Sequence, residues 1–189
     1  MDSVVRRPSI SVSVQPFFLL TNAGKVDLEI QPLDHKFAYV LSAEFYGGRV
    51  QDDFIYDRLN GFGIGLLQKY KFKRQLSSPY FAYGAIYRHQ EIAIETEGFS
   101  PYQDNGLTYY EFGPIKKLLI IDAMLLSTTF GYQKVSNDFV YDFYVGLGYK
   151  TPIRDLNFQG YRKYDQYVSS YAYKGFSILV GLKIGYQLQ

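Results

Sequence analysis

Hydrophobic and polar side chains alternate along most of this chain. In residues 139–150, FVYDFYVGLGYK, a large apolar or aromatic group stands at every odd position, and the even positions include Asp142, Lys150 and two glycines. Successive side chains of a β-strand point to opposite faces, which gives a period of two residues. The segment is therefore predicted to be a strand with two unlike faces.

The same alternation recurs in other segments. The eight predicted strands are 9–20, 25–31, 37–46, 61–72, 80–89, 117–132, 139–150 and 175–186. The phase of 117–132 is ambiguous because LLIIDAMLL is apolar on both faces, but STTFGYQ then resumes the alternation. No linker or repeat divides the chain, and a length of 189 residues suits one domain, 1–189.

The connections between these segments fall into two classes. The first, 21–24, is short; after it, short connections at 32–36, 73–79 and 133–138 alternate with long ones at 47–60, 90–116 and 151–174. Loops of the second class are uncommon in compact soluble domains. In an up-and-down barrel, alternate connections lie at the same end, so the long ones would share one end. The predicted fold class is an all-β, eight-stranded antiparallel up-and-down barrel.

The composition of the two strand faces indicates which one points outward. The polar face is mainly glycine, alanine and serine with a few charges, in a chain with 20 Tyr and 15 Phe. An eight-stranded barrel is only just wide enough for side chains, so about four large groups from every strand would not fit inside. The apolar face is therefore predicted to meet lipid in a transmembrane barrel. A soluble barrel that binds an apolar ligand is the alternative.

Four stretches carry a resemblance to a known family: SVQPFFLLTNAGKVDLEIQP (13–32), FGYQ (130–133), DFYVGLGYK (142–150) and GLKIGYQLQ (181–189). Through them the chain resembles small eight-stranded outer-membrane barrels of the OmpX, OmpW and OmpA-transmembrane-domain type, and looks closest to barrels of Bacteroidetes-type Gram-negative bacteria. The resemblance implies a bacterial outer-membrane location among membrane lipid. Pro16 departs from the pattern because proline cannot donate to a sheet ladder, and we expect a bulge there.

Several charged residues lie on the predicted lumen face. They are Glu29, Glu44, Lys69, Arg88, Asp142 and Lys183. With the N-terminus at the inner end, Glu44 and Arg88 lie toward the outer end and the other four toward the inner end. An unpaired buried charge is very costly, so we expect a paired network that plugs the barrel. A gated path for protons or small ions is the alternative, because the barrel is too narrow for a porin-like channel.

The two histidines have different predicted settings. His35 is expected to be a solvated turn residue beside Asp34, and His89 ends the fifth strand at the outer rim. Lipid-modifying outer-membrane enzymes use a rim histidine with a serine and a carboxylate. RHQE has no serine beside it, and Ser100 or Ser127 would have to approach through folding. A lipid-modifying barrel enzyme using His89 is therefore an alternative to a protein without enzymatic activity.

The long loops are the candidate binding surfaces. Residues 90–111 carry five carboxylates and no Lys or Arg, whereas 150–174 is mostly basic and rich in tyrosine, which is enriched in binding surfaces. The predicted surface in the second loop comprises Tyr161, Arg162, Lys163, Tyr164, Tyr167, Tyr171 and Tyr173. The two loops either pair their opposite charges, or 90–116 and 151–174 dock a partner protein, glycan or lipid head group.

The remaining features narrow the function further. A net charge of +2 gives no reason to expect nucleic acid, and the absence of Cys excludes thiolate metal sites. No cofactor or metal motif is present. MDSVVRRPSISV lacks the apolar core of a signal peptide, which fits either a cytoplasmic chain or a mature form without its leader. We expect a non-enzymatic outer-membrane barrel with a plugged polar lumen. It would act through its extracellular loops as a binding surface, or as an accessory subunit of an envelope complex.

Overall fold

A computed structural model describes most of the chain. It covers residues 8–32, 36–52, 55–73, 75–153, 171 and 173–188. His35, the expected turn residue, lies outside the described residues. So does most of the predicted loop surface, namely Tyr161, Arg162, Lys163, Tyr164 and Tyr167.

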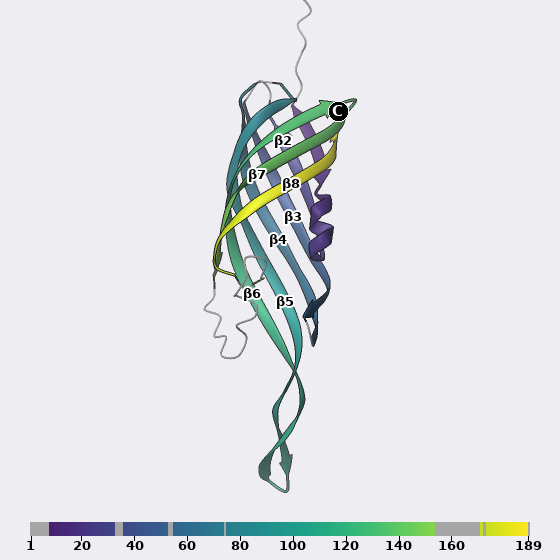
Figure 1. Cartoon of the computed structure of the whole chain (residues 1–189), viewed down its shortest axis with the longest axis vertical. Helices are drawn as coiled ribbons and strands as arrows, with labels where there is room; N and C mark the ends of the chain where they lie inside the picture. The colour runs from purple at the N-terminus through teal and green to yellow at the C-terminus, as the bar shows by residue number, and fades with distance from the viewer. Residues whose placement is uncertain are drawn as a thin grey trace, which may run out of the picture.

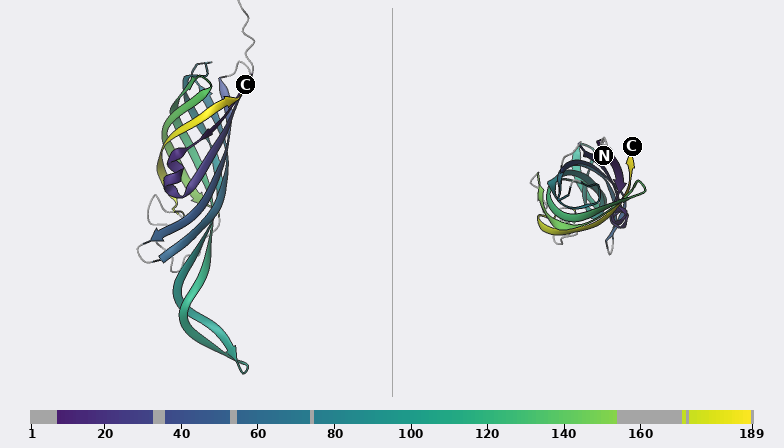
Figure 2. Two further views of the ribbon diagram at one scale, coloured as in Figure 1. Left: turned by 90° about the vertical axis from the view of Figure 1, so that its right-hand side faces the viewer. Right: turned by 90° about the horizontal axis from the view of Figure 1, so that it is seen from above.

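Eight strands and one short 3₁₀ helix form the described fold. They are β1 (Ser9–Val14), η1 (Pro16–Thr21), β2 (Ala23–Gln31), β3 (Phe37–Asp52), β4 (Ile55–Lys71), β5 (Ser78–Asp104), β6 (Leu107–Ser136), β7 (Phe139–Pro152) and β8 (Gly175–Leu188). Each strand pairs antiparallel with the next, and β8 pairs with β1, which closes the barrel. Figure 1 shows the tilted strands, and Figure 2 shows the ring from above. The predicted eight-stranded antiparallel up-and-down barrel is confirmed.

Side chains alternate between the lumen and the outer surface. On β7, Val140 and Asp142 are buried, whereas Phe139, Tyr141 and Phe143 are exposed. Large apolar groups are exposed on the outer face of every strand, for example Ile10, Val26, Leu41, Phe62, Phe81, Phe130, Phe143 and Ile178. The apolar face therefore points away from the lumen, and most buried polar groups lie inside it.

The first strand ends much earlier than predicted. β1 stops at Val14, and Pro16 opens η1, which runs to Thr21. Proline has no N–H for the ladder and fixes its own φ, so here it ends the strand. The strand predicted at 9–20 is confirmed over Ser9–Val14 and wrong beyond it, and the bulge expected at Pro16 is wrong.

Other strands extend further than their alternation indicates. β3 and β4 pair as far as Asp52 and Ile55, so most of the predicted 47–60 connection is sheet. β5 and β6 pair as far as Asp104 and Leu107, so the predicted 90–116 loop is a two-stranded ribbon that projects beyond the barrel (Figure 1). These extensions are stabilised by backbone pairing with the adjacent strand. The alternation of side chains within one segment gives no information about that pairing. We call this projecting part, residues 93–118, the ribbon.

A two-residue turn closes the ribbon. Asn105 and Gly106 have φ of 49° and 78°, and a type I′ turn requires positive φ at both central residues. The end of the barrel from which the ribbon projects is called the ribbon end below. The opposite end, with the short turn at Asn137 and Asp138, is called the turn end.

Gly131 on β6 lies where no side chain fits. A Cβ at Gly131 would lie 2.6 Å from the Tyr80 ring and 2.7 Å from the carbonyl oxygen of Phe143. On the same strand, a Cβ at Gly113 would meet nothing within 4 Å. The two glycines therefore form a matched pair for testing how tightly the lumen is packed.

We expect Gly131→Ala to lower the free energy of unfolding by about 1–3 kcal/mol, because Tyr80 must leave its packed position. Gly113→Ala is the control and should change it by less than about 0.5 kcal/mol. Urea unfolding of the purified protein, followed by circular dichroism, measures both. Equal effects of the two substitutions would contradict the described packing.

Candidate functional site

Four charged side chains meet in the lumen near the turn end. This Lys69 cluster consists of Glu29, Lys69, Lys71 and Asp142. Lys69 Nζ lies 2.6 Å from Glu29 Oε2 and 2.8 Å from Asp142 Oδ2, and Lys71 Nζ lies 2.9 Å from Glu29 Oε1. The Tyr80 hydroxyl donates to Asp142 Oδ1 at 2.6 Å, and Lys69 Nζ lies 4.0 Å from the centre of the Tyr80 ring. Each charge in the cluster has a partner of opposite sign, as buried charges require.

A second group, the Glu44 cluster, lies nearer the ribbon end. Arg88 donates to both carboxylate oxygens of Glu44, at 2.7 Å from Nε and 3.1 Å from Nη2. Lys25 Nζ lies 3.1 Å from Glu44 Oε1, and the Tyr46 hydroxyl donates to Glu44 Oε2 at 2.6 Å. Bidentate pairing with arginine fixes geometry as well as charge, so Glu44 and Arg88 hold β3 and β5 in a defined relation.

Asp27 joins the barrel wall to the start of η1. Lys183 Nζ lies 2.6 Å from Asp27 Oδ2, and Gln15 Nε2 donates to the same oxygen at 2.7 Å. Ser42 donates to Asp27 Oδ1, and the Tyr144 hydroxyl donates to Gln15 Oε1 at 2.6 Å. Because Gln15 directly precedes η1, this network fixes the point where the chain leaves the sheet.

The structure places all six predicted lumen charges in these networks. Glu44 pairs with Arg88 toward the ribbon end, and the other four, Glu29, Lys69, Asp142 and Lys183, lie in the networks toward the turn end. The sequence reasoning left out three further members, Lys25, Asp27 and Lys71. Each lies an even number of positions from a predicted member on the same strand, so the two-residue period would have found them.

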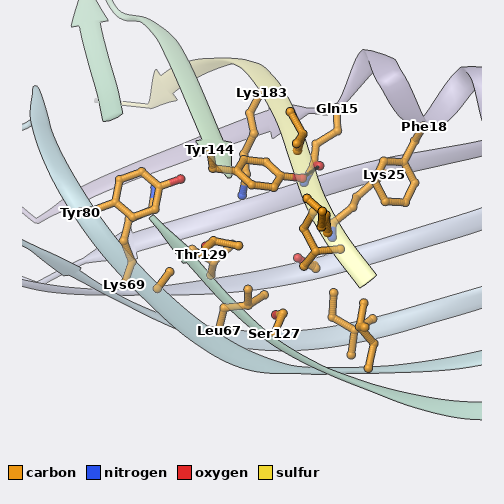
Figure 3. A pocket seen from close by; sticks show the side chains of 18 of the residues that line it. Gln15, Phe18, Lys25, Leu67, Lys69, Tyr80, Ser127, Thr129, Tyr144 and Lys183 are labelled. Carbon is orange, nitrogen blue, oxygen red and sulfur yellow. Dashed lines mark hydrogen bonds between the residues drawn. The ribbon is translucent and has the colours of Figure 1, made fainter. Parts of the chain in front are cut away.

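Two adjoining cavities lie beside these clusters. The smaller, of about 160 Å³, has Lys69 and Tyr80 in its lining toward the turn end. The larger, of about 290 Å³, continues toward the ribbon end. Figure 3 shows Tyr144 and Lys183 across the smaller cavity from Leu67 and Ser127. Both cavities share a lining of Gln15, Phe18, Arg88, Leu125, Leu179 and Val180.

The cavity lining combines cationic and apolar side chains. No carboxylate is among the described residues that line either cavity. The cations are Lys25, Lys69, Arg88 and Lys183 in the smaller cavity, and Arg88 and Lys150 in the larger. The apolar wall includes Val40, Leu67, Ile86, Leu125 and Leu179. The cations of the smaller cavity are already paired: Lys25 and Arg88 with Glu44, Lys69 with Glu29 and Asp142, and Lys183 with Asp27.

Two buried polar atoms at the cavities have no hydrogen-bond partner among the described atoms. They are Oε1 of Gln90, in the larger cavity, and Oγ of Ser127, in the smaller. Gln90 is 3% exposed and Ser127 is 6% exposed. An unsatisfied buried polar group costs roughly 1–3 kcal/mol, so a polar ligand atom or a water at these positions would be stabilised.

His89 lies on the outer face of β5, opposite Asp122 of β6. His89 Nδ1 lies 2.7 Å from Asp122 Oδ1, and the Tyr87 hydroxyl donates to the same oxygen at 2.7 Å. On the other side of the ring, His89 Nε2 lies 3.4 Å from Glu91 Oε1. The histidine therefore has carboxylates at both nitrogens.

The two candidate serines do not approach His89. Ser127 lines the smaller cavity inside the barrel, on the opposite face of β6 from Asp122. Ser100 lies in the ribbon, where its hydroxyl donates to the Glu111 carbonyl at 3.4 Å. The arrangement thus has a base and an orienting carboxylate but neither of the nucleophiles considered from the sequence.

The ribbon carries exposed aromatic pairs across its two strands. Phe99 and Phe112 have ring centres 5.2 Å apart, and Tyr102 and Tyr109 have ring centres 5.5 Å apart. Phe99 and Tyr110 are 67% and 68% exposed. Such pairs stabilise a sheet, but a soluble surface rarely gathers so many large exposed rings.

Tyr171 and Tyr173 are the two described members of the predicted loop surface. Both are half-buried, and both line the larger cavity. Burial raises the pKa of the Tyr171 hydroxyl. The structure therefore places these two tyrosines at the ribbon-end mouth of the lumen.

Comparison with known proteins gave no match: no family model, no curated protein and no solved structure matches this chain significantly. Within the described part of the chain, no helix is long and apolar enough to cross a membrane. Among the same residues, no group of His, Asp or Glu is arranged to hold a metal ion.

We expect Lys69→Met to lower the free energy of unfolding by about 3–5 kcal/mol, because Glu29 and Asp142 would keep buried charges without their shared partner. Lys134→Met is the control: this lysine is exposed on the outer face of β6, and its loss should cost less than about 0.5 kcal/mol. Urea titration of both variants beside the wild type tests the difference. A Lys69→Met protein as stable as the control would show that the cluster does not hold the barrel together.

Proposed function

We propose that this protein is a bacterial outer-membrane β-barrel without enzymatic activity, related to the small OmpX-like barrels. Its lumen is plugged by paired charges, and it acts through the ribbon and the 151–174 loop as a binding surface. In the envelope it serves as an accessory subunit that presents this surface to another cell-surface protein.

One observation carries the membrane assignment: large apolar side chains are exposed on the outer face of all eight strands, while charges are buried inside. Phe143, Ile178 and Leu66 are 55%, 75% and 56% exposed. In water, such a continuous apolar surface would drive aggregation, because soluble monomers rarely expose apolar patches beyond a few hundred Å². In a bilayer the same surface is solvated by acyl chains. A soluble barrel for an apolar ligand would need the opposite orientation.

The apolar outer face of the barrel also has features of a lipid interface at its two ends. Phe139 and Tyr186 are in contact on the outer face near the turn end, with ring centres 5.8 Å apart. On β5 and β6 the apolar outer face gives way to His89 and Asp122 before the ribbon begins. Aromatic and polar side chains are typical of the levels where lipid meets water.

The lumen supports a plugged barrel. The Lys69 cluster links β2, β4 and β7 across the turn end of the lumen. Conduction past the Lys69 cluster would have to break pairs at 2.6 Å and 2.8 Å and leave buried charges without partners. The same packing leaves the outward surfaces as the sites where the protein meets partners.

The ribbon supports the binding role. It projects beyond the barrel as two strands, and past Ala93 no third strand pairs with it among the described residues (Figure 1). Two-stranded ribbons are at best marginally stable alone, and exposed clusters of large rings mark interaction sites. The tyrosines and phenylalanines, with Glu97, Asp104 and Glu111 among them, fit a partner surface with apolar and basic groups.

Two substitutions on one face of β7 test the bilayer assignment. We expect Val145→Arg, near the middle of the strand, to cost about 2–4 kcal/mol in phospholipid vesicles, and Phe139→Arg, at the turn end, to cost only about 0–1 kcal/mol. The free energy of unfolding in urea, measured in vesicles, gives both values. A wild-type protein that stays monodisperse without detergent, or equal costs at the two positions, would rule out the assignment.

Shortening the ribbon tests the binding role. Removing residues 98–103 and 108–113 keeps the Asn105–Gly106 turn and the strand register while deleting Phe99, Tyr102, Tyr109, Tyr110 and Phe112. We expect an unchanged barrel that no longer cross-links to its partner in native envelopes, with cross-linked proteins identified by mass spectrometry. The control is Tyr132→Phe, on the outer face of the barrel. An identical set of cross-linked proteins with the short ribbon would refute the proposal.

A further inference from the structure

The Gln90 side chain carries a buried oxygen without a partner. Gln90 lies on the lumen face of β5 and is 3% exposed, and its Oε1 accepts no hydrogen bond from any described atom. Buried polar groups in folded proteins almost always have a partner. An oxygen that lacks one therefore marks a position where a molecule from outside the chain would supply the donor.

The strands on both sides of β5 enclose Gln90. It pairs with Gly61 of β4 and with Ile121 of β6. A Cβ at Gly61 would lie 3.3 Å from Gln90 Cγ, so the glycine leaves room for the glutamine side chain. Gln90 is therefore part of the packed inner wall of the barrel.

Gln90 lines the larger of the two cavities, which has a volume of about 290 Å³. The apolar part of the same lining consists of Phe17, Phe18, Leu125, Leu179 and Val180. Phe18 reaches in from η1, and its ring centre lies 5.1 Å from Lys25 Nζ (Figure 3). An apolar cavity of about 150 Å³ holds one benzene molecule. The larger cavity therefore has room for a molecule about the size of two fused rings.

The charged groups of the larger cavity are already paired. Arg88 donates to both carboxylate oxygens of Glu44, which also pairs with Lys25 and accepts from the Tyr46 hydroxyl. Lys150, the other cation of this lining, is not without a partner either. A charged ligand would have to break such pairs or bury a charge of its own without one, which is very costly. The cavity therefore favours an uncharged molecule.

The neutral polar side chains leave an acceptor open. Gln15 donates to Asp27 through Nε2 and accepts from Tyr144 through Oε1, and the Tyr173 hydroxyl donates to a backbone carbonyl. Within the described lining of the larger cavity, Gln90 Oε1 is the buried side-chain atom that lacks a partner. A glutamine oxygen can only accept, so the ligand must bring an O–H or N–H donor.

Paired charges lie on the turn-end side of the cavities. Lys69 lines the smaller cavity and forms ion pairs with Glu29 and Asp142 of the Lys69 cluster. At the ribbon end, Tyr171 and Tyr173 line the larger cavity. A molecule that enters at the ribbon end would therefore be held in the cavity and not passed on through the barrel.

We propose that the larger cavity is a binding site for an uncharged, apolar molecule of about two fused rings that carries one hydroxyl or N–H donor. The donor bonds to Gln90 Oε1, and the apolar part lies against Phe18, Leu125 and Leu179. This site goes beyond the proposed binding role of the ribbon. It depends neither on the ribbon nor on the membrane location.

Equilibrium dialysis of radiolabelled 2-naphthol tests the proposal. The full chain is held in phosphatidylcholine nanodiscs, and empty nanodiscs measure the naphthol that dissolves in lipid. We expect saturable binding to the protein above that background. 2-Naphthoate has the same rings but a negative charge, so it should displace naphthol much less effectively than unlabelled 2-naphthol does. Absence of saturable binding, or equal displacement by the two compounds, would overturn the proposal.

Gln90→Met tests the hydrogen bond, because methionine has a similar length and no carbonyl. We expect the affinity for 2-naphthol to fall about three- to tenfold, as the loss of one neutral hydrogen bond predicts. 2-Fluoronaphthalene has no donor, and its affinity should not fall. The variant should fold as the wild type does, since it loses a buried oxygen that has no partner. An unchanged affinity for 2-naphthol, or an equal loss for both compounds, would refute the hydrogen bond.

Two further variants test where the molecule lies. Leu179→Trp should abolish the binding of both compounds by filling the cavity, and circular dichroism checks its fold. Gln103→Met, the same substitution as at Gln90 but in the exposed ribbon, is the matched control and should bind as the wild type does. Binding of 2-naphthol at wild-type affinity by a folded Leu179→Trp protein would show that the site is elsewhere. If Leu179→Trp does not fold, the comparison of Gln90→Met with Gln103→Met still decides.

The two proposals fail separately. A protein with the shortened ribbon should bind 2-naphthol with unchanged affinity, whatever the ribbon binds. Loss of naphthol binding on shortening the ribbon would overturn the assignment of the site to the cavity.

Discussion

The narrow lumen imposes the constraint on which the rest of this structure depends: every charge that enters it must find a partner there. Lys69 forms ion pairs with Glu29 of β2 and Asp142 of β7. Arg88 of β5 forms an ion pair with Glu44 of β3. These contacts join strands that lie 40 to 73 residues apart in the chain. Since large apolar side chains occupy much of the outer face, the polar lumen is where the barrel gains its specific tertiary contacts.

The sheet closes into a barrel even though the first and last strands pair over only part of the length of β8. The ring of ladders is complete, because β8 pairs with β1, but the pairing covers only the part of β8 near the C-terminus. Pro16 ends β1, and the polar contacts of Gln15 with Asp27 and Tyr144 hold the departing chain in place. A single proline thus replaces the second half of the predicted first strand with η1, without breaking the ring of ladders.

Much of the fold follows from the sequence, because a two-residue period is a strong signal when both faces are distinct. Seven of the eight predicted strands coincide with strands of the structure over all, or all but one, of their residues. The phase of the alternation alone then identifies the charged residues that face the lumen. The backbone conformation at Pro16 could not be predicted, because a β-bulge and the first turn of a helix both accommodate a residue without an N–H. The extension of β5 and β6 into the ribbon depends on pairing between strands, which the pattern of a single strand does not encode.

The candidate site was harder to foresee for a different reason. The cavities are lined by side chains from η1, from β2 to β8 and from the segment around Tyr171, and their positions depend on the register between the strands. His89 shows the same limit: the sequence places it beside Glu91, whereas its shortest contact is with Asp122, 33 residues away. The alternation along one strand shows which face a residue occupies. Which residues meet in a site depends on the register between strands, and one strand's sequence does not give that.

The brevity of β1 also bears on how the cylinder is completed. Only five residue pairs, from Ile10–Leu188 to Val14–Ile184, form the seam between the first and last strands, against 27 between β5 and β6. A chain that folds as successive hairpins joins this seam last, since its two halves come from opposite ends of the polypeptide. Because this seam has the fewest paired residues, we expect β1 to separate from β8 before the other strands separate when the barrel unfolds.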